Sequence, residues 1–156
     1  MAVFFFDSNT IVKYYISEPG SNWVRSLVND KNNSCLICDI SLVEVAAAIS
    51  QMRQFQPFGR AFVHGTIERF QNDVRSGLFL SHPIDTDTLE RAAAIGETHA
   101  LKGCDAIQLA SAALVEENIG IEIVFVTGDK QVLHVAQFEA LETDNPFDHT
   151  DEDKQK

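Results

Sequence analysis

The sequence lacks any apolar run long enough to cross a membrane, and its N-terminus lacks the basic segment that opens a signal peptide. Asp7 interrupts the apolar run of residues 3–6 after only a few positions. Membrane-spanning and secreted proteins are therefore disfavoured, and the cytoplasm is the expected location. The 156 residues suit a single domain of ordinary size with its own hydrophobic core.

Cysteine is scarce, and the three cysteines cannot all pair within one chain. Cys35 and Cys38 have the spacing of a Cys-x-x-Cys motif, but residues 34–38 are typical of a buried strand. Alternation along a strand would point the two thiols to opposite faces. Cys104 stands alone, so no second pair of zinc-ligand type follows. Reduced, buried thiols are the better interpretation.

Basic residues are also few, with 12 Lys and Arg against 23 Asp and Glu, for a net charge of −11. The segment from Glu139 onward carries −5 of this charge and the rest of the chain −6. An acidic body is a poor general binder of nucleic acid, because neutralising phosphates drives most of that affinity. A cluster of acidic residues that holds a metal would explain part of this excess of negative charge.

Several enzyme signatures are missing from the sequence, among them Gly-x-Ser-x-Gly, the P-loop and Gly-x-Gly-x-x-Gly. The five histidines show no metal-ligand spacing. A phosphatase of the haloacid dehalogenase type also begins with a strand ending in Asp, but it would place a second Asp two residues later. Asn9 stands at that position.

Short apolar runs alternate with helical patterns along the chain. The expected strands are 3–6, 35–38, 78–80 and 121–126. The expected helices cover about 23–28, 41–55, 62–74, 85–101, 105–117 and 129–138. Ser21, after the turn at residues 18–20, is the predicted N-cap of the first of these helices. This alternation predicts an α/β domain with a mostly parallel sheet that helices cover on both faces. The domain should span residues 1–147, before an acidic, disordered tail over 148–156.

Four acids occupy similar places in this pattern. Asp7 ends the first strand, and Glu44 lies in the first turn of the helix after the second strand. Asp105 opens a helix, and Asp129 follows the last long strand. In parallel sheets, sites form at the carboxyl edge of the strands beside the helix N-termini. We therefore expect the four carboxylates to lie together.

Each acid also has a local explanation. Asp7 fits an Asx turn through Asn9, and Glu44 fits a capping box with Ser41. Asp105 and Asp129 fit ordinary N-caps. Together, however, four carboxylates at one edge would repel each other unless a cation lies between them. Oxygen ligands suit Mg²⁺ or Mn²⁺, and these ions serve phosphodiester hydrolysis by activating water and neutralising charge on the phosphate.

The four acids stand in segments that together resemble a known family. The segments are Phe4-Phe5-Phe6-Asp7-Ser8-Asn9, Ile40-Ser41-Leu42-Val43-Glu44-Val45, Cys104-Asp105-Ala106-Ile107-Gln108-Leu109-Ala110 and Phe125-Val126-Thr127-Gly128-Asp129. Their order and content resemble a PIN-domain ribonuclease of the VapC toxin type. The resemblance runs from about residue 3 to 147, including a closing strand within residues 141–147 followed by Asn-Pro.

The resemblance implies a three-layer α/β/α domain and a Mg²⁺- or Mn²⁺-dependent endoribonuclease, a phosphodiester hydrolase acting on RNA. It also implies a small antitoxin partner and a homodimer. Asp7 and Asp105 fall in the best-matching segments and should be the main metal ligands, with Glu44 and Asp129 completing the site. Ser8 and Thr127 are candidate donors that hold these carboxylates in place, or plain strand-end residues.

Two alternatives remain open at the level of sequence. One is a PIN-type nuclease that processes RNA outside a toxin system, and the other is a catalytically degenerate domain that binds a protein partner. For a partner or a second copy, the candidate surface is an apolar groove around Phe55, Phe58, Phe62 and Phe70. These phenylalanines could equally fill the core. Lys13 and Lys130 follow candidate site acids and could reach RNA, or could be simply solvated.

Overall fold

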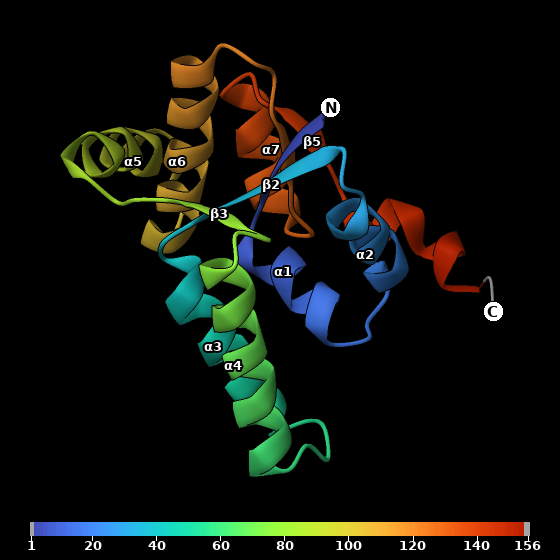
Figure 1. Ribbon diagram of the computed structural model, residues 1–156. Coiled ribbons are helices and arrows are strands. Elements are labelled where there is room, and N and C mark those ends of the chain that lie inside the picture. The colour runs from blue at the N-terminus through green and yellow to red at the C-terminus, as the bar shows by residue number, and fades with distance from the viewer. Residues whose placement is uncertain (1, 155–156) are drawn as a thin grey trace.

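The computed structural model describes residues 2–154, and Figure 1 shows a parallel sheet between two layers of helices. The sheet has the strand order β3-β2-β1-β4-β5, and every neighbouring pair is parallel. Its strands are β1 (Ala2–Phe6), β2 (Asn33–Cys38), β3 (Leu80–His82), β4 (Val124–Val126) and β5 (Glu142–Asp144). The helices are α1 (Ser8–Tyr15), α2 (Ser21–Asn29), α3 (Ser41–Met52), α4 (Arg60–Arg75), α5 (Thr86–His99), α6 (Gly103–Ile119), α7 (Lys130–Phe138) and the 3-10 segment η1 (Pro146–Lys154).

Strand β1 lies at the centre of the sheet because its apolar sequence is suited to burial on both faces. Phe4 aligns with Val124 on one side, and Phe5 aligns with Leu36 on the other. The hydrogen bonding continues one residue beyond the strand, where the backbone N–H of Asp7 donates to the carbonyl of Val126 at 3.0 Å. The end of β1 is thereby fixed to the end of β4.

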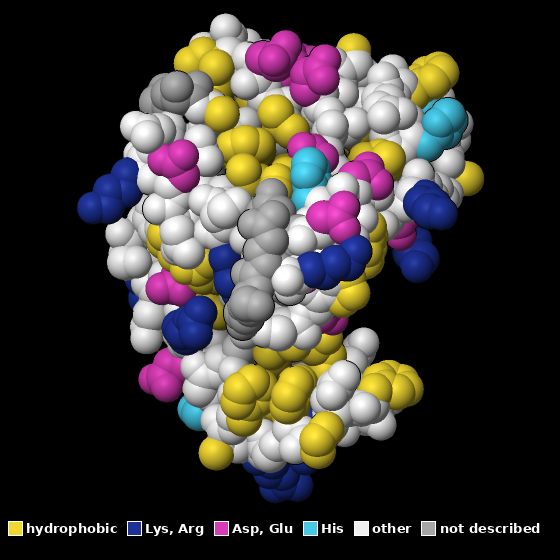
Figure 2. Space-filling view, turned by 90° about the vertical axis from the view of Figure 1, so that its right-hand side faces the viewer, with side chains coloured by type: hydrophobic (Ala, Val, Ile, Leu, Met, Phe, Trp, Pro, Cys, Tyr) yellow, Lys and Arg dark blue, Asp and Glu magenta, His cyan; other side chains and the backbone are white. Residues whose placement is uncertain are grey.

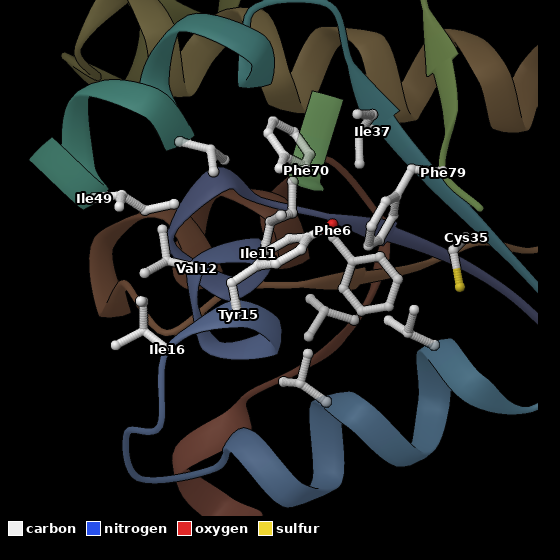
Figure 3. Packing of buried hydrophobic residues seen from close by; sticks show 14 of the residues in the cluster. Phe6, Ile11, Val12, Tyr15, Ile16, Cys35, Ile37, Ile49, Phe70 and Phe79 are labelled. Atoms are coloured by element: carbon white, nitrogen blue, oxygen red, sulfur yellow. The ribbon is translucent and has the colours of Figure 1, made fainter. Parts of the chain in front are cut away.

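Each face of the sheet carries its own hydrophobic cluster. Helices α1 to α4 cover one face, where Phe6 and Phe70 are fully buried among aliphatic and aromatic side chains (Figure 3). Helices α5 to α7 cover the other face, around Phe5 and Phe125, whose ring centroids lie 6.0 Å apart. The predicted three-layer α/β/α class with a parallel central sheet is confirmed.

The thiols of β2 follow the expected alternation. Cys35 belongs to the cluster under α1 to α4, and Cys38 belongs to the cluster under α5 to α7. Both are free and buried, whereas Cys104 is free and exposed, so its predicted burial is wrong. Burial raises the pKa of the Cys35 thiol to about 12, which keeps it protonated and chemically inert.

Helix α1 was not expected from the sequence. Its Ser8-Asn9-Thr10 start and its β-branched Ile11 and Val12 have low helix propensity. Burial of one side of α1 against the sheet overrides that preference. The helix begins directly after Asp7, so the chain turns sharply at the end of β1.

The predicted N-cap at Ser21 is wrong. Gly20 occupies the N-cap position of α2 with φ +86°, and Ser21 is the first helical residue. The Ser21 hydroxyl instead bridges the preceding turn, accepting from the backbone N–H of Glu18 at 2.8 Å and donating to the carbonyl of Ile16 at 3.0 Å. Among the strands, the predicted 78–80 is shifted to β3, and the predicted 121–126 is reduced to the shorter β4.

The tail also differs from its expected disorder, since residues 146–154 form η1 against α2. The ring of His149 stacks on Trp23 with centroids 4.0 Å apart. The carboxylate of Asp153 accepts from the backbone N–H groups of Gly20 at 2.6 Å and Asn22 at 3.0 Å. These contacts, which composition does not reveal, order a polar segment. Residues 155–156 of the predicted tail lie outside the described residues.

None of the helices between residues 2 and 154 combines the length and apolarity that spanning a bilayer requires.

Candidate active site at the carboxyl edge of the sheet

Asp7 lies at the centre of the carboxyl edge, because it joins the middle strand β1 to α1. Its side chain is 4% exposed. The oxygen Oδ2 accepts from the Thr127 hydroxyl at 2.6 Å and from the Asn9 amide at 2.6 Å. Asn9 therefore contacts Asp7 through its side-chain amide. These donors come from the segments that follow β1 and β4, so the pairing of the two strands places them.

The Glu44 side chain extends from the first turn of α3 toward Ser8, the residue that follows Asp7. Its Oε2 accepts from the Ser8 hydroxyl at 2.9 Å and from the Gln108 amide at 2.6 Å. The capping-box alternative is therefore wrong: Ile40 is the N-cap of α3 and no side chain caps it. The hydroxyl of Ser41 lies 3.1 Å from that of Ser8 instead.

Asp105 and Asp129 stand at the starts of two other helices. Asp105 is half-buried in the first turn of α6, two residues after the helix begins, so it is not the N-cap. Asp129 is exposed and does cap α7, because Oδ1 accepts from the backbone N–H groups of Gln131 at 2.8 Å and Val132 at 3.2 Å. The local explanation holds for Asp129 and fails for Asp105.

The four carboxylates influence one another electrostatically. Burial raises the pKa of Asp7 to about 6, repulsion from Asp105 and Glu44 adds to the rise, and the Thr127 hydrogen bond opposes it. Burial also raises the pKa of Asp105, with repulsion from Asp129 and Glu44 adding to it. The structure thus brings all four predicted acids into one electrostatic group.

The chemistry of this group suits a hard divalent cation, since carboxylates are the preferred ligands of such ions and a cation would remove their mutual repulsion. Among residues 2–154, however, no three His, Cys, Asp or Glu side chains already converge to hold an ion. Asp7, Glu44 and Asp129 each engage one oxygen in the hydrogen bonds described above. Binding one ion would therefore draw the carboxylates closer together.

Gln108 is a member of the site that the sequence did not single out as functional. Its side chain is 1% exposed. The amide Nε2 donates to Glu44 and to the Ser8 hydroxyl at 3.0 Å, and Oε1 accepts from the Ser8 backbone N–H at 3.2 Å. A usable signal exists, because Gln108 is a polar residue in an apolar helix and follows Asp105 by three positions, which places both on one face.

A family model described as the PIN domain matches residues 4–137. No curated protein sequence matches the chain significantly.

Solved structures share the fold at low sequence identity. FitAcB from Neisseria gonorrhoeae is 17% identical with a TM-score of 0.62, over 92% of this chain and 98% of that one. VapBC2 from Rickettsia felis, bound to a promoter DNA fragment, is 16% identical with a TM-score of 0.59, over 92% and 98%. A toxin-antitoxin complex from Klebsiella pneumoniae is 19% identical with a TM-score of 0.53, over 83% and 87%. At these identities the likeness concerns the fold alone.

Proposed function

The chain belongs to the PIN-domain family, since the family model covers residues 4–137, and from this premise we propose that it is a Mg²⁺- or Mn²⁺-dependent endoribonuclease. The observation that carries the proposal is the electrostatic group of Asp7, Glu44, Asp105 and Asp129 at the carboxyl edge of the sheet. Neighbouring carboxylates repel one another, and a bound cation would relieve this repulsion.

In this proposal Asp7 and Asp105 are the main metal ligands, and Glu44 and Asp129 complete the site. The ion would neutralise charge that develops on the scissile phosphate and lower the pKa of water. Thr127 holds Asp7 through its hydroxyl, and so fixes the carboxylate orientation before substrate arrives. Without a metal, burial raises the pKa of Asp7, and a bound cation would favour its ionised, metal-binding form.

Asp7→Asn and Asp105→Asn test the nuclease. Each substitution keeps the side-chain shape and removes the charge, so cleavage of a mixed single-stranded RNA pool in Mg²⁺ or Mn²⁺ should be lost. Asp87→Asn, an exposed acid in the first turn of α5, is the matched control and should cleave normally. EDTA should abolish cleavage by the unsubstituted chain.

Near-normal cleavage by both site variants would overturn the mechanism. If the unsubstituted chain cuts nothing in either metal, the catalytically degenerate, protein-binding alternative takes its place.

We further propose that the nuclease is the toxin of a toxin-antitoxin pair. Support comes from the fold that it shares with the Klebsiella pneumoniae toxin-antitoxin complex and from an exposed apolar surface. Helices α3 and α4 and the connecting residues 53–59 form an arm that extends from the sheet (Figure 1), and Figure 2 shows hydrophobic side chains gathered on it.

The arm carries most of the phenylalanines that the sequence singled out. Phe55 is 84% exposed and Phe62 is 46% exposed, whereas Phe70 is fully buried in the core. The rings of Phe58 and Phe62 are tilted against each other with centroids 4.6 Å apart, and both line a cavity of about 440 Å³ together with Met52. An amphipathic antitoxin helix is the proposed occupant of this surface, and a second copy of the chain in a homodimer is the alternative.

Size-exclusion chromatography with light scattering distinguishes these occupants. A dimer that Phe55→Ser and Phe62→Ser convert to a monomer assigns the arm to self-association. A monomer that forms a defined complex with a small co-expressed protein, through the same side chains, assigns it to an antitoxin. A monomer that forms neither complex contradicts both partner proposals and leaves an RNA-processing nuclease outside a toxin system.

A further inference from the structure

A second cavity, of about 340 Å³, adjoins the carboxylate site. Its lining residues are Asn9, Lys13, Glu18, Gly128, Asp129 and Phe147. It shares Asn9 and Asp129 with the site, and its volume falls within the range of small-molecule pockets. A group held here would therefore lie directly beside the proposed reacting phosphate.

Phe147 contributes an aromatic wall that is fixed but not buried. Its ring is 47% exposed. The backbone N–H of Phe147 donates to Oδ1 of Asn145 at 3.0 Å, which fixes the start of η1. The ring lies so close to Gly128 that a Cβ at that position would come within 2.8 Å of Cε2. A ring that packs against the backbone and remains in contact with solvent offers a surface for stacking.

Lys13 supplies positive charge in the same cavity. Its side chain is almost fully buried, and Nζ lies 4.3 Å from the centroid of the Phe147 ring. The ammonium group also pairs with Oε2 of Glu18 at 3.3 Å. Lys13 thus holds the ring by a cation–π contact and is the cationic residue among those that line the cavity.

We propose that this cavity is a nucleotide subsite, in which the part of the Phe147 ring that Lys13 leaves open stacks the base next to the scissile phosphate, and Lys13 supplies positive charge near the phosphate of that nucleotide. The proposal rests on the ribonuclease function proposed above. It also answers the objection raised by a net charge of −11. An acidic chain gains little from phosphate neutralisation, so base stacking is the available source of affinity for single-stranded RNA.

Equilibrium binding of a fluorescein-labelled, mixed-sequence single-stranded RNA tests the subsite without cleavage. Fluorescence anisotropy is measured in Mg²⁺ with the Asp7→Asn chain, in which cleavage is expected to be lost. Adding Phe147→Leu should weaken binding by about 5- to 150-fold, the usual effect of losing one stacked base. Adding Phe147→Tyr should leave the affinity within about twofold, because the tyrosine ring also stacks.

Two further variants separate stacking from general damage. Phe138→Leu is the matched control, since Phe138 is 71% exposed at the far end of α7 from Asp129, and it should bind RNA normally. Lys13→Gln should reduce the slope of log affinity against log salt by about one, the contribution of one phosphate contact. Melting curves of every variant check that the fold is retained.

Equal affinity of the Phe147→Leu and Phe147→Tyr chains overturns the subsite, and so does the absence of RNA binding by the parent Asp7→Asn chain. Failure of the ribonuclease proposal can be distinguished from failure of the subsite proposal. If the unsubstituted chain cuts RNA but Phe147→Leu does not change RNA affinity, the nuclease proposal stands and the subsite proposal fails. If the unsubstituted chain cuts nothing but Phe147→Leu weakens RNA binding, the subsite proposal stands and the nuclease proposal fails.

Discussion

Replacing Asp7 by Asn should make the protein more stable while it abolishes activity. The carboxylate of Asp7 is buried, and its pKa is raised from 3.8 to about 6. This difference corresponds to about 3 kcal/mol of unfavourable free energy for the ionised form at neutral pH. Asn carries no charge and its carbonyl can still accept from Thr127 and Asn9. We therefore expect a gain of up to about 3 kcal/mol and, for a chain of this size, a rise in Tm of up to about 6–12 °C.

The gain in stability from Asp7→Asn should increase as the pH rises from about 4 to about 7. Because the folded pKa of Asp7 lies above the unfolded value, the folded state binds the proton more tightly between about pH 4 and pH 6. The stability linked to this proton is fully present below pH 3.8 and is lost as the pH rises through about 6. The Asp7→Asn chain lacks this linkage, so the two melting temperatures should converge near pH 4 and separate by pH 7.

Thermal unfolding followed by circular dichroism, in EDTA from pH 4 to pH 8, measures this difference. Mn²⁺ at 100 times its dissociation constant should add about 2.7 kcal/mol to the unsubstituted chain and much less to the variant. Asp87→Asn is the control and should not raise the Tm, since an acid in the first turn of α5 is favourable. A variant that melts at or below the unsubstituted chain at pH 7 in EDTA would refute the reasoning.

Two further substitutions probe the contacts around the site and the tail. Gln108→Leu removes the donor to Glu44 and leaves the buried Ser8 N–H without its acceptor, so urea unfolding should show a loss of about 1–3 kcal/mol. RNA cleavage should fall by about 10- to 100-fold, and an unchanged rate would remove Gln108 from the site. Asp153→Ala removes the bonds to Gly20 and Asn22, so limited proteolysis should cut the tail faster; equal resistance would show that η1 does not depend on this anchor.

The layered fold and the place of the four acids were predictable because strong local signals determine them. Continuous apolar runs mark buried parallel strands, and the carboxyl ends of such strands share one edge. Asp7 follows the run Val3–Phe6, and Asp129 follows closely on Phe125 and Val126. For these two acids, chain order alone implies proximity once β1 and β4 pair.

Contacts between side chains that are distant in the sequence were beyond prediction. Ser41 and Glu44 have the spacing of a capping box, yet Glu44 bonds to Ser8 and Gln108, because α3 packs beside α1 and the Gln108 amide of α6 reaches Glu44. The order of η1 depends in the same way on Trp23, which meets His149 only in the folded chain. Local spacing gives the candidates for a bond, and tertiary packing selects among them.

The pairing of β1 with β4 has a consequence for how the protein is made. Phe4 aligns with Val124, so the central pair of strands joins segments about 120 residues apart. Such long-range contacts are slow to form, because the intervening chain must be ordered before they add stability. On the ribosome, β1 and α1 emerge long before Thr127 and Asp129, which complete the carboxylate group. A growing or truncated chain that ends before β4 therefore lacks Thr127 and Asp129, and the site is completed only in the last steps of synthesis and folding.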